Sequence, residues 1–167
     1  MLDMIKAVLP GMRQRRAGHI VNLSSIGGLV TFPGIGYYHM AKFALEALSE
    51  TLSKEVGPLG IGVTAVAPGA FRTDFRGGSM QLSKVQIADY APTAGHARQS
   101  ALAGHGQQRG DPVRACQAIL LALQAEKPPL HLFLGPDTIE LVHRKMDELQ
   151  QELQAWDSLT RSTDVDG

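Results

Sequence analysis

Cysteine is nearly absent from this chain of 167 residues, since Cys116 is the only one. No disulfide can form within the chain, and a cytoplasmic compartment is the expected one. The sequence around Cys116, ACQAILLAL, predicts a buried thiol on a helix. The six histidines have no HExxH or CxxC companion, so the sequence predicts no metal site.

Excess charge and long apolar runs are also missing. The 16 basic residues balance the 16 acidic ones, so the net charge gives no reason to expect binding to nucleic acid or to an anionic membrane. No apolar run reaches the roughly 18–20 residues needed to cross a bilayer. The short basic run at residues 13–16 is expected to lie in a solvated loop. These absences leave one ordinary globular domain, without a nucleic-acid or membrane partner.

The hydrophobic pattern predicts an α/β chain with a parallel sheet of about three strands flanked by helices. The clearest helix spans residues 38–56, where apolar residues recur every three or four positions. It lies between two short apolar runs, and a strand–helix–strand order of this kind forms a right-handed βαβ unit. The strands are expected at residues 19–24, 61–67 and 130–134, with the first of them buried.

Two segments outside this unit have clear sequence features. Residues 2–14 predict the end of an amphipathic helix, which Pro10 and Gly11 would interrupt or finish. Residues 70–110 have no strong periodicity. A loop of that length in a compact domain is usually functional, often as a lid over an active site, and we interpret it as a substrate loop.

A C-terminal helix is predicted over residues 136–157, as the last element of a single unit that covers 1–167. Asp137 and Glu140 have the spacing of a capping box at its start. Its apolar residues recur at alternating intervals of three and four, which is typical of a coiled-coil seam or of a helix docked on the core. Fewer than three heptads favour the docked helix.

Tyr38 and Lys42 lie four residues apart on the predicted helix 38–56, and Ser25 closes the strand that precedes it. A lysine at i+4 lies on the same helix face as the tyrosine. Its ammonium favours the phenolate and lowers a phenol pKa that is ordinarily about 10. Ser25 lies at the carboxyl end of a strand, where open α/β sheets place their sites, and can hold a substrate oxygen beside the phenol. The three residues form a proton-transfer set for interconverting an alcohol and a carbonyl, whereas Tyr37 lacks a lysine at i+4.

Three motifs in this order, NLSS at 22–25, YxxxK at 38–42 and PGxxxT at 68–73, strongly resemble the short-chain dehydrogenase/reductase family. The resemblance implies an oxidoreductase that transfers a hydride between NAD or NADP and a small-molecule alcohol or carbonyl, and a homo-oligomer. It implies that Ser25 orients the carbonyl, that Tyr38 is the acid/base, and that Lys42 lowers the tyrosine pKa. The residues expected to contact the cofactor are Tyr38, Lys42, Pro68, Gly69, Phe71 and Thr73.

The Gly-rich phosphate-binding turn of that family has no counterpart before residue 19. Residues 26–36 are rich in glycine, but they follow the serine-bearing strand and lead to Tyr38, so they cannot replace that turn. The sequence therefore predicts the C-terminal portion of such an enzyme, with a partial Rossmann-like sheet. One alternative is a truncated, non-catalytic fragment that acts at most as a dimerisation module. Another is a relative of the sugar-nucleotide epimerases and dehydratases, which use the same Tyr–Lys pair.

We expect the 167-residue chain by itself to show no saturable binding of NADH or NADPH. Pyrophosphate and adenosine recognition normally comes from a Gly-rich turn and a helix N-terminus in a first βαβ unit. We also expect the chain to associate or precipitate, because strand 19–24 would present an apolar edge. Cofactor titration beside a form extended at the N-terminus, together with size-exclusion chromatography, checks both expectations. Tight cofactor binding by a soluble monomer would contradict them.

Overall fold

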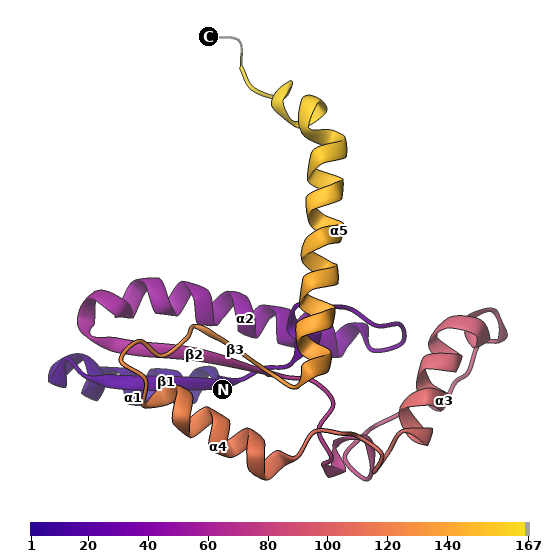
Figure 1. The fold of residues 1–167 in the computed structure, drawn as a ribbon, viewed down its shortest axis with the longest axis horizontal. Helices are drawn as coiled ribbons and strands as arrows, with labels where there is room; N and C mark the ends of the chain where they lie inside the picture. The colour runs from indigo at the N-terminus through magenta and orange to yellow at the C-terminus, as the bar shows by residue number, and fades with distance from the viewer. Residues whose placement is uncertain (166–167) are drawn as a thin grey trace.

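The protein contains one parallel sheet of three strands, in the order β1-β2-β3. The computed structural model describes residues 1–165, so the last two residues of the predicted unit lie outside the described part. The strands are β1 (Gly18–Leu23), β2 (Ile61–Pro68) and β3 (His131–Leu134). Figure 1 shows them as the central layer, with helices on both sides. The predicted α/β class and the three predicted strands are confirmed.

Helices α1 (Leu2–Arg15) and α2 (Gly36–Val56) cover one face of the sheet. Helix α2 connects β1 to β2, which run parallel with Ile20 opposite Val63. A buried cluster joins the two helices to this face, and five further apolar side chains pack against it. The buried members of the cluster are Ile5, Ile20, Leu52, Val56, Ile61 and Val63.

Helix α4 (Pro112–Leu123) lies on the side of the sheet opposite α2. Side chains alternate between the two faces of a strand, so Val21 and Leu23 point away from the cluster that contains Ile20. They are 42% and 63% exposed. Strand β1 is therefore buried on only one face, and the expectation of a buried first strand is wrong for the other face.

Helix α1 continues through Pro10, so the expectation that Pro10 and Gly11 end or interrupt it is wrong. Leu9 and Met12, on either side of these two residues, both pack against the buried cluster. This tertiary packing outweighs the local penalty of an internal proline. The basic run at 13–16 is also not a loop, because its first residues form the last turn of α1. Positive charge there complements the negative end of the helix dipole.

Cys116 is exposed on α4, so the expectation of a buried thiol is wrong. The apolar run that contains it is hydrophobic around most of the helix, and α4 has only the sheet to pack against. Leu120 and Leu121 on the same helix are 60% and 69% exposed.

The segment 70–110 is partly helical rather than a plain loop. It contains the short turns Asp74–Arg76, Ala88–Tyr90 and Ala91–Gly95, and then helix α3 (His96–Ala103). Its two ends are tied together, because Phe71 pairs with Gly110 in a parallel bridge and the Arg72 amide donates to the Gly110 carbonyl over 2.8 Å. The whole segment therefore leaves and rejoins the body of the molecule at one place, beyond the end of β2.

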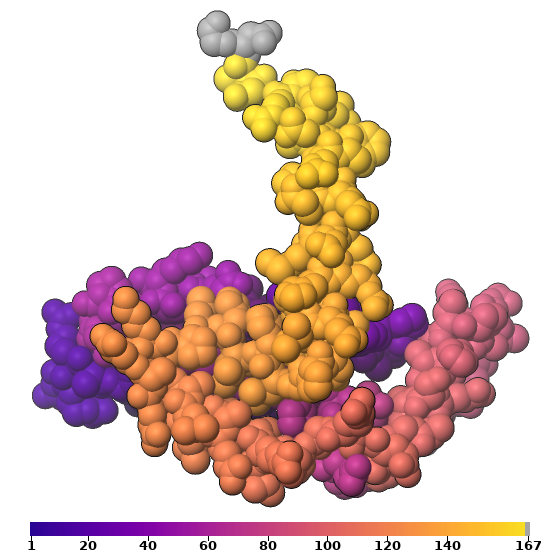
Figure 2. All heavy atoms as spheres, viewed as in Figure 1, coloured from indigo at the N-terminus to yellow at the C-terminus, as the bar shows by residue number. Residues whose placement is uncertain are grey.

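Helix α5 (Pro136–Arg161) projects away from the body, as Figures 1 and 2 show. Only Thr138 and Val142 are buried along it, whereas Met146 and Trp156 are each 62% exposed. The prediction of a docked helix is wrong beyond Val142. Within the described residues, no helix combines the length and the apolar character that crossing a membrane requires.

Two leucine substitutions compare the stability that the buried cluster contributes with the stability that α5 contributes. Leu52→Ala should lower the free energy of unfolding by about 2–5 kcal/mol, because Leu52 is 6% exposed and its removal leaves a cavity. Leu153→Ala should change it by no more than about 0.5 kcal/mol, because Leu153 is 60% exposed. Urea unfolding followed by circular dichroism measures both. A loss of similar size in the two variants would show that α5 is docked in solution.

Candidate active site

The carboxyl ends of the three strands lie at one edge of the parallel sheet, which is where open α/β sheets place their sites. Ser25 follows β1, Pro68 ends β2, and Gly135 follows β3. Helix α2 begins at this edge and runs back along the sheet. The chain order alone therefore gathers the predicted site residues in one region.

Tyr38 and Lys42 lie together on the first turns of α2. The Lys42 Nζ is 5.8 Å from the centre of the Tyr38 ring and donates a hydrogen bond of 3.0 Å to the carbonyl oxygen of Leu23. Lys42 is thus tied to the end of β1. Tyr38 is half-buried, whereas its neighbour Tyr37 is 88% exposed and points to solvent. The two neighbouring tyrosines therefore have different environments.

Ser25 begins a short 3-10 turn, Ile26–Gly28, that lies against Tyr38. Its Oγ accepts a hydrogen bond from the Gly27 amide at 3.0 Å, so the hydroxyl hydrogen can still be donated. Gly27 touches the tyrosine, since a Cβ built there would lie 2.8 Å from the Tyr38 Cε1. The turn that carries the serine therefore contacts the phenol ring.

Burial lowers the pKa of Lys42, and the negative charge of Glu46, one helical turn further on, raises it. These opposite effects have a simple cause. Removing water disfavours the ammonium, and a nearby carboxylate favours it. Lys42 is therefore a partly desolvated cation with a defined counter-charge.

His39 is a site residue that the sequence argument missed. It is 5% exposed, and its ring bridges two points of the connection between β1 and α2. The Phe32 amide donates to Nε2 over 2.8 Å, and Nδ1 lies 2.7 Å from the Gly27 carbonyl oxygen. An amide can only donate, so Nε2 accepts and Nδ1 carries the hydrogen. A neutral imidazole thus fixes the serine turn beside Tyr38. No spacing rule identifies this residue, because both partners are backbone groups.

The turn after β2 contains the predicted cofactor contacts. The Gly69 amide donates to the Leu134 carbonyl oxygen over 2.9 Å, and the Ala70 amide donates to the Asp137 Oδ2 over 2.8 Å. A side chain at Gly69 would overlap the Asp137 carboxylate. Asp137 therefore fixes the turn, and its predicted role in a capping box is wrong. The residue before α5 is Gly135 with φ 100°, and no side chain caps the helix.

The remaining two predicted contacts, Phe71 and Thr73, have other partners in the structure. Phe71 pairs with Gly110, and Thr73 is exposed with its Oγ1 accepting from the Phe75 amide at 3.4 Å. The Phe75 ring, however, lies 5.6 Å from the Tyr38 ring. The segment 70–110 therefore begins by folding over the tyrosine.

Known proteins resemble this chain over most of its length. A family profile described as short chain dehydrogenase matches residues 1–82. The protein named Oxidoreductase BOA17, from Botryotinia fuckeliana, is 36% identical in a match that covers 93% of this chain and 56% of that protein. The crystal structure of a short-chain dehydrogenase from Streptomyces avermitilis is 43% identical with a TM-score of 0.87, and the match covers 96% of this chain and 58% of that chain.

The chain belongs to the short-chain dehydrogenase/reductase family. It spans a little over half the length of these two relatives, 56% and 58%. A more distant member, from Burkholderia phymatum and crystallised in complex with NAD, is 19% identical with a TM-score of 0.68, over 89% of this chain and 54% of that one. At that identity the likeness concerns the fold alone. The three-strand sheet of this chain is the family's Rossmann-like arrangement.

The contribution of His39 to this part of the short-chain dehydrogenase fold can be tested by His39→Leu. The Phe32 amide and the Gly27 carbonyl would lose their partner inside the protein, which should cost about 1–3 kcal/mol of unfolding free energy. His143→Leu on the exposed face of α5 is the control and should stay within about 0.5 kcal/mol of the parent. Equal stabilities for the two variants would show that the His39 hydrogen bonds contribute nothing.

Proposed function

We propose that the site built by Ser25, Tyr38 and Lys42 interconverts an alcohol and a carbonyl by NAD(P)-dependent hydride transfer. The observation that carries this proposal is the position of Tyr38, with the Lys42 ammonium 5.8 Å from its ring and the serine turn in contact with it. Family membership supports the reaction class, and the printed names of the relatives are those of oxidoreductases and dehydrogenases.

Each residue has a distinct task in the reduction direction. Ser25 donates its hydroxyl hydrogen to the carbonyl oxygen, which orients and polarises the substrate. Tyr38 gives its phenolic proton to the oxygen as negative charge develops there. Lys42 stabilises the resulting phenolate by its charge. In the oxidation direction the same proton returns to Tyr38.

The cofactor is NAD or NADP, and it supplies or accepts the hydride when bound. Lys42 fits a role in holding it, because an ammonium has three donors and the hydrogen bond to Leu23 uses one. Tyr38 and the turn of Pro68, Gly69, Phe71 and Thr73 would contact the nicotinamide end. The substrate loop at 70–110 would close the site, since it already begins over Tyr38. A small molecule as substrate, a cytoplasmic location and a homo-oligomer complete the proposal.

A second candidate function is that of a non-catalytic association module. The observation that favours it is the exposed apolar surface on β1, where Leu23 is 63% exposed beside an edge that pairs with no other strand in the described residues. Such an edge invites pairing with another chain. Turnover by any form of the protein that depends on Tyr38 separates the two candidates.

Tyr38→Phe provides the decisive test of the first candidate. In an N-terminally extended form that binds cofactor and turns over a carbonyl substrate, the change should lower kcat by at least about 100-fold, because the proton donor is lost. The Kd for NADPH or NADH should change by less than about 3-fold, since the ring and Lys42 remain. Stopped-flow turnover and fluorescence titration measure the two quantities.

Tyr37→Phe is the matched control, because Tyr37 is the neighbouring residue and is 88% exposed. Its kcat should equal that of the parent. If the two substitutions affected kcat alike, or if Tyr38→Phe weakened cofactor binding as much as turnover, Tyr38 would be a structural residue.

A further inference from the structure

Four residues at intervals of four follow one ridge of α2, namely Tyr38, Lys42, Glu46 and Glu50. Residues with this spacing are neighbours on a helix surface. Tyr38 and Lys42 belong to the proposed catalytic set, but Glu46 has no role in it. Glu46 is also the most unusual of the four, because it is a carboxylate that is only 5% exposed.

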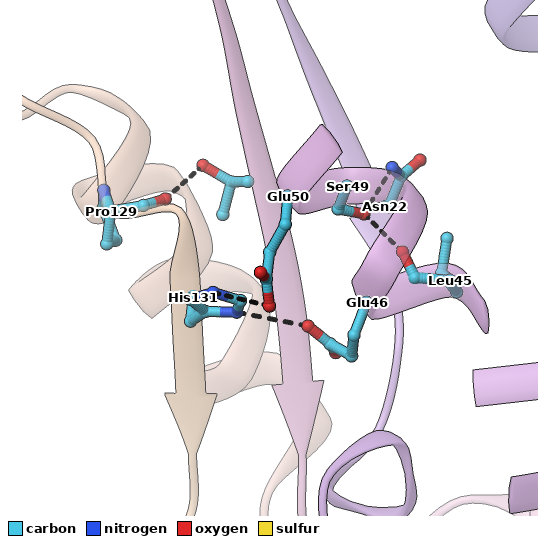
Figure 3. Close-up of polar contacts among 8 residues, drawn as sticks. Asn22, Leu45, Glu46, Ser49, Glu50, Pro129 and His131 are labelled. Carbon is cyan, nitrogen blue, oxygen red and sulfur yellow. Dashed lines mark hydrogen bonds and ion pairs between the residues drawn. The ribbon is translucent and has the colours of Figure 1, made fainter. Parts of the chain in front are cut away.

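The neighbours of Glu46 provide a partner for only one of its two carboxylate oxygens. Its Oε2 lies 3.2 Å from the Nδ1 of His131 at the start of β3, and the other ring nitrogen of His131 lies 3.7 Å from the Oε1 of Glu50. Figure 3 shows the His131 ring facing both carboxylates. The Oε1 of Glu46 is buried and has no hydrogen-bond partner among the described residues. A buried carboxylate oxygen that lacks a partner costs stability.

The serine turn also lies against the Glu46 side chain. A Cβ built at Gly28 would lie 2.9 Å from the Glu46 Cγ and 3.0 Å from the Ser24 Oγ. Ser24 Oγ likewise has no partner among residues 1–165. The absence of a side chain at Gly28 is thus what gives Glu46 room beneath the end of β1. This is also the strand end whose Leu23 carbonyl accepts from Lys42.

We propose that Glu46 is a positioning residue for Lys42: its buried carboxylate, anchored by His131, is the fixed counter-charge one helical turn from the ammonium that the Leu23 carbonyl holds. The role rests on the proposed function of Lys42 and extends it. The direction of the effect follows from charge, because a carboxylate one turn away opposes the desolvation that lowers the pKa of Lys42. The described titratable groups around Lys42 are Tyr38 and Glu46 on α2, with His131 one contact further on β3. Strand β1 contributes only the Leu23 carbonyl.

Glu46→Gln removes the charge and preserves the shape. It should lower the pKa of Lys42 by about 0.5 or more. Competitive labelling of the amines with trace acetic anhydride between pH 7 and 11, read by peptide mass spectrometry, measures this pKa without any need for activity. Lys54, exposed on the same helix, is the internal reference. If Glu46→Gln fails to fold, Glu46→Met removes the same charge without leaving a polar group.

Glu50→Gln is the matched control. Glu50 is on the same ridge and faces the same imidazole, but its side chain is 46% exposed and it lies a turn further from Lys42. This variant should leave the Lys42 pKa unchanged, and Glu46→Asp should restore part of the loss because it keeps the charge. An unchanged Lys42 pKa in the Glu46 variants, or an equal drop in Glu50→Gln, would overturn the proposal.

The pH profile of turnover in an active, extended form gives the second measurement. Because Glu46 raises the pKa of Lys42, its removal makes Lys42 lose its proton at lower pH, and the alkaline limb of kcat should move to lower pH by the same amount. A labelling shift without a move of this limb would leave Glu46 as the counter-charge but would argue against Lys42 as a catalytic group. The inference and the proposed function can therefore fail separately.

Discussion

The contact between the turn after β1 and the first half of α2 is the constraint on which the site depends. Two glycines make it possible, because side chains at Gly27 and Gly28 would collide with Tyr38 and Glu46. The His39 ring then fastens the turn to the helix through hydrogen bonds to two backbone groups, the Phe32 amide and the Gly27 carbonyl. The chain thus positions Ser25 by packing a loop directly on the helix that carries the tyrosine, with backbone and ring atoms in van der Waals contact.

Helix α2 also presents a row of ionisable side chains along one ridge. From Tyr38 to Glu50 the ridge carries a phenol, an ammonium and two carboxylates in succession. The imidazole of His131, on β3, contacts both carboxylates. Other polar contacts fix the helix against the strands. The Asn22 amide donates to the Ser49 hydroxyl over 2.9 Å, and Ser49 donates to the Leu45 carbonyl (Figure 3). A helix held this firmly can keep a half-buried lysine and a buried carboxylate at a constant separation, which the proposed proton chemistry requires.

The apolar surfaces that remain exposed have two different physical origins. On β1 they come from the sheet, since Val21 and Leu23 point to the face on which α4 packs against β3, at the other edge of the sheet. On α5 they come from a helix that leaves the body after Val142 and exposes Leu149, Leu153 and Trp156. The Streptomyces avermitilis structure matches 96% of the chain, a share that includes most of α5. The projecting helix is therefore compatible with the fold of a relative.

The sequence by itself determined the sheet, the helix between its first two strands, and the placement of Tyr38 and Lys42 on one face of that helix. These depend on short-range periodicity, because apolar spacing selects helix or strand and a separation of four places two residues on one face. The positions of residues that depend on long-range contacts were decided only by the tertiary structure. It placed Asp137 on the Ala70 amide, His131 on Glu46, and Cys116 in solvent. Each of these outcomes depends on a partner far away in the chain, or on the absence of one, and no local pattern encodes that information.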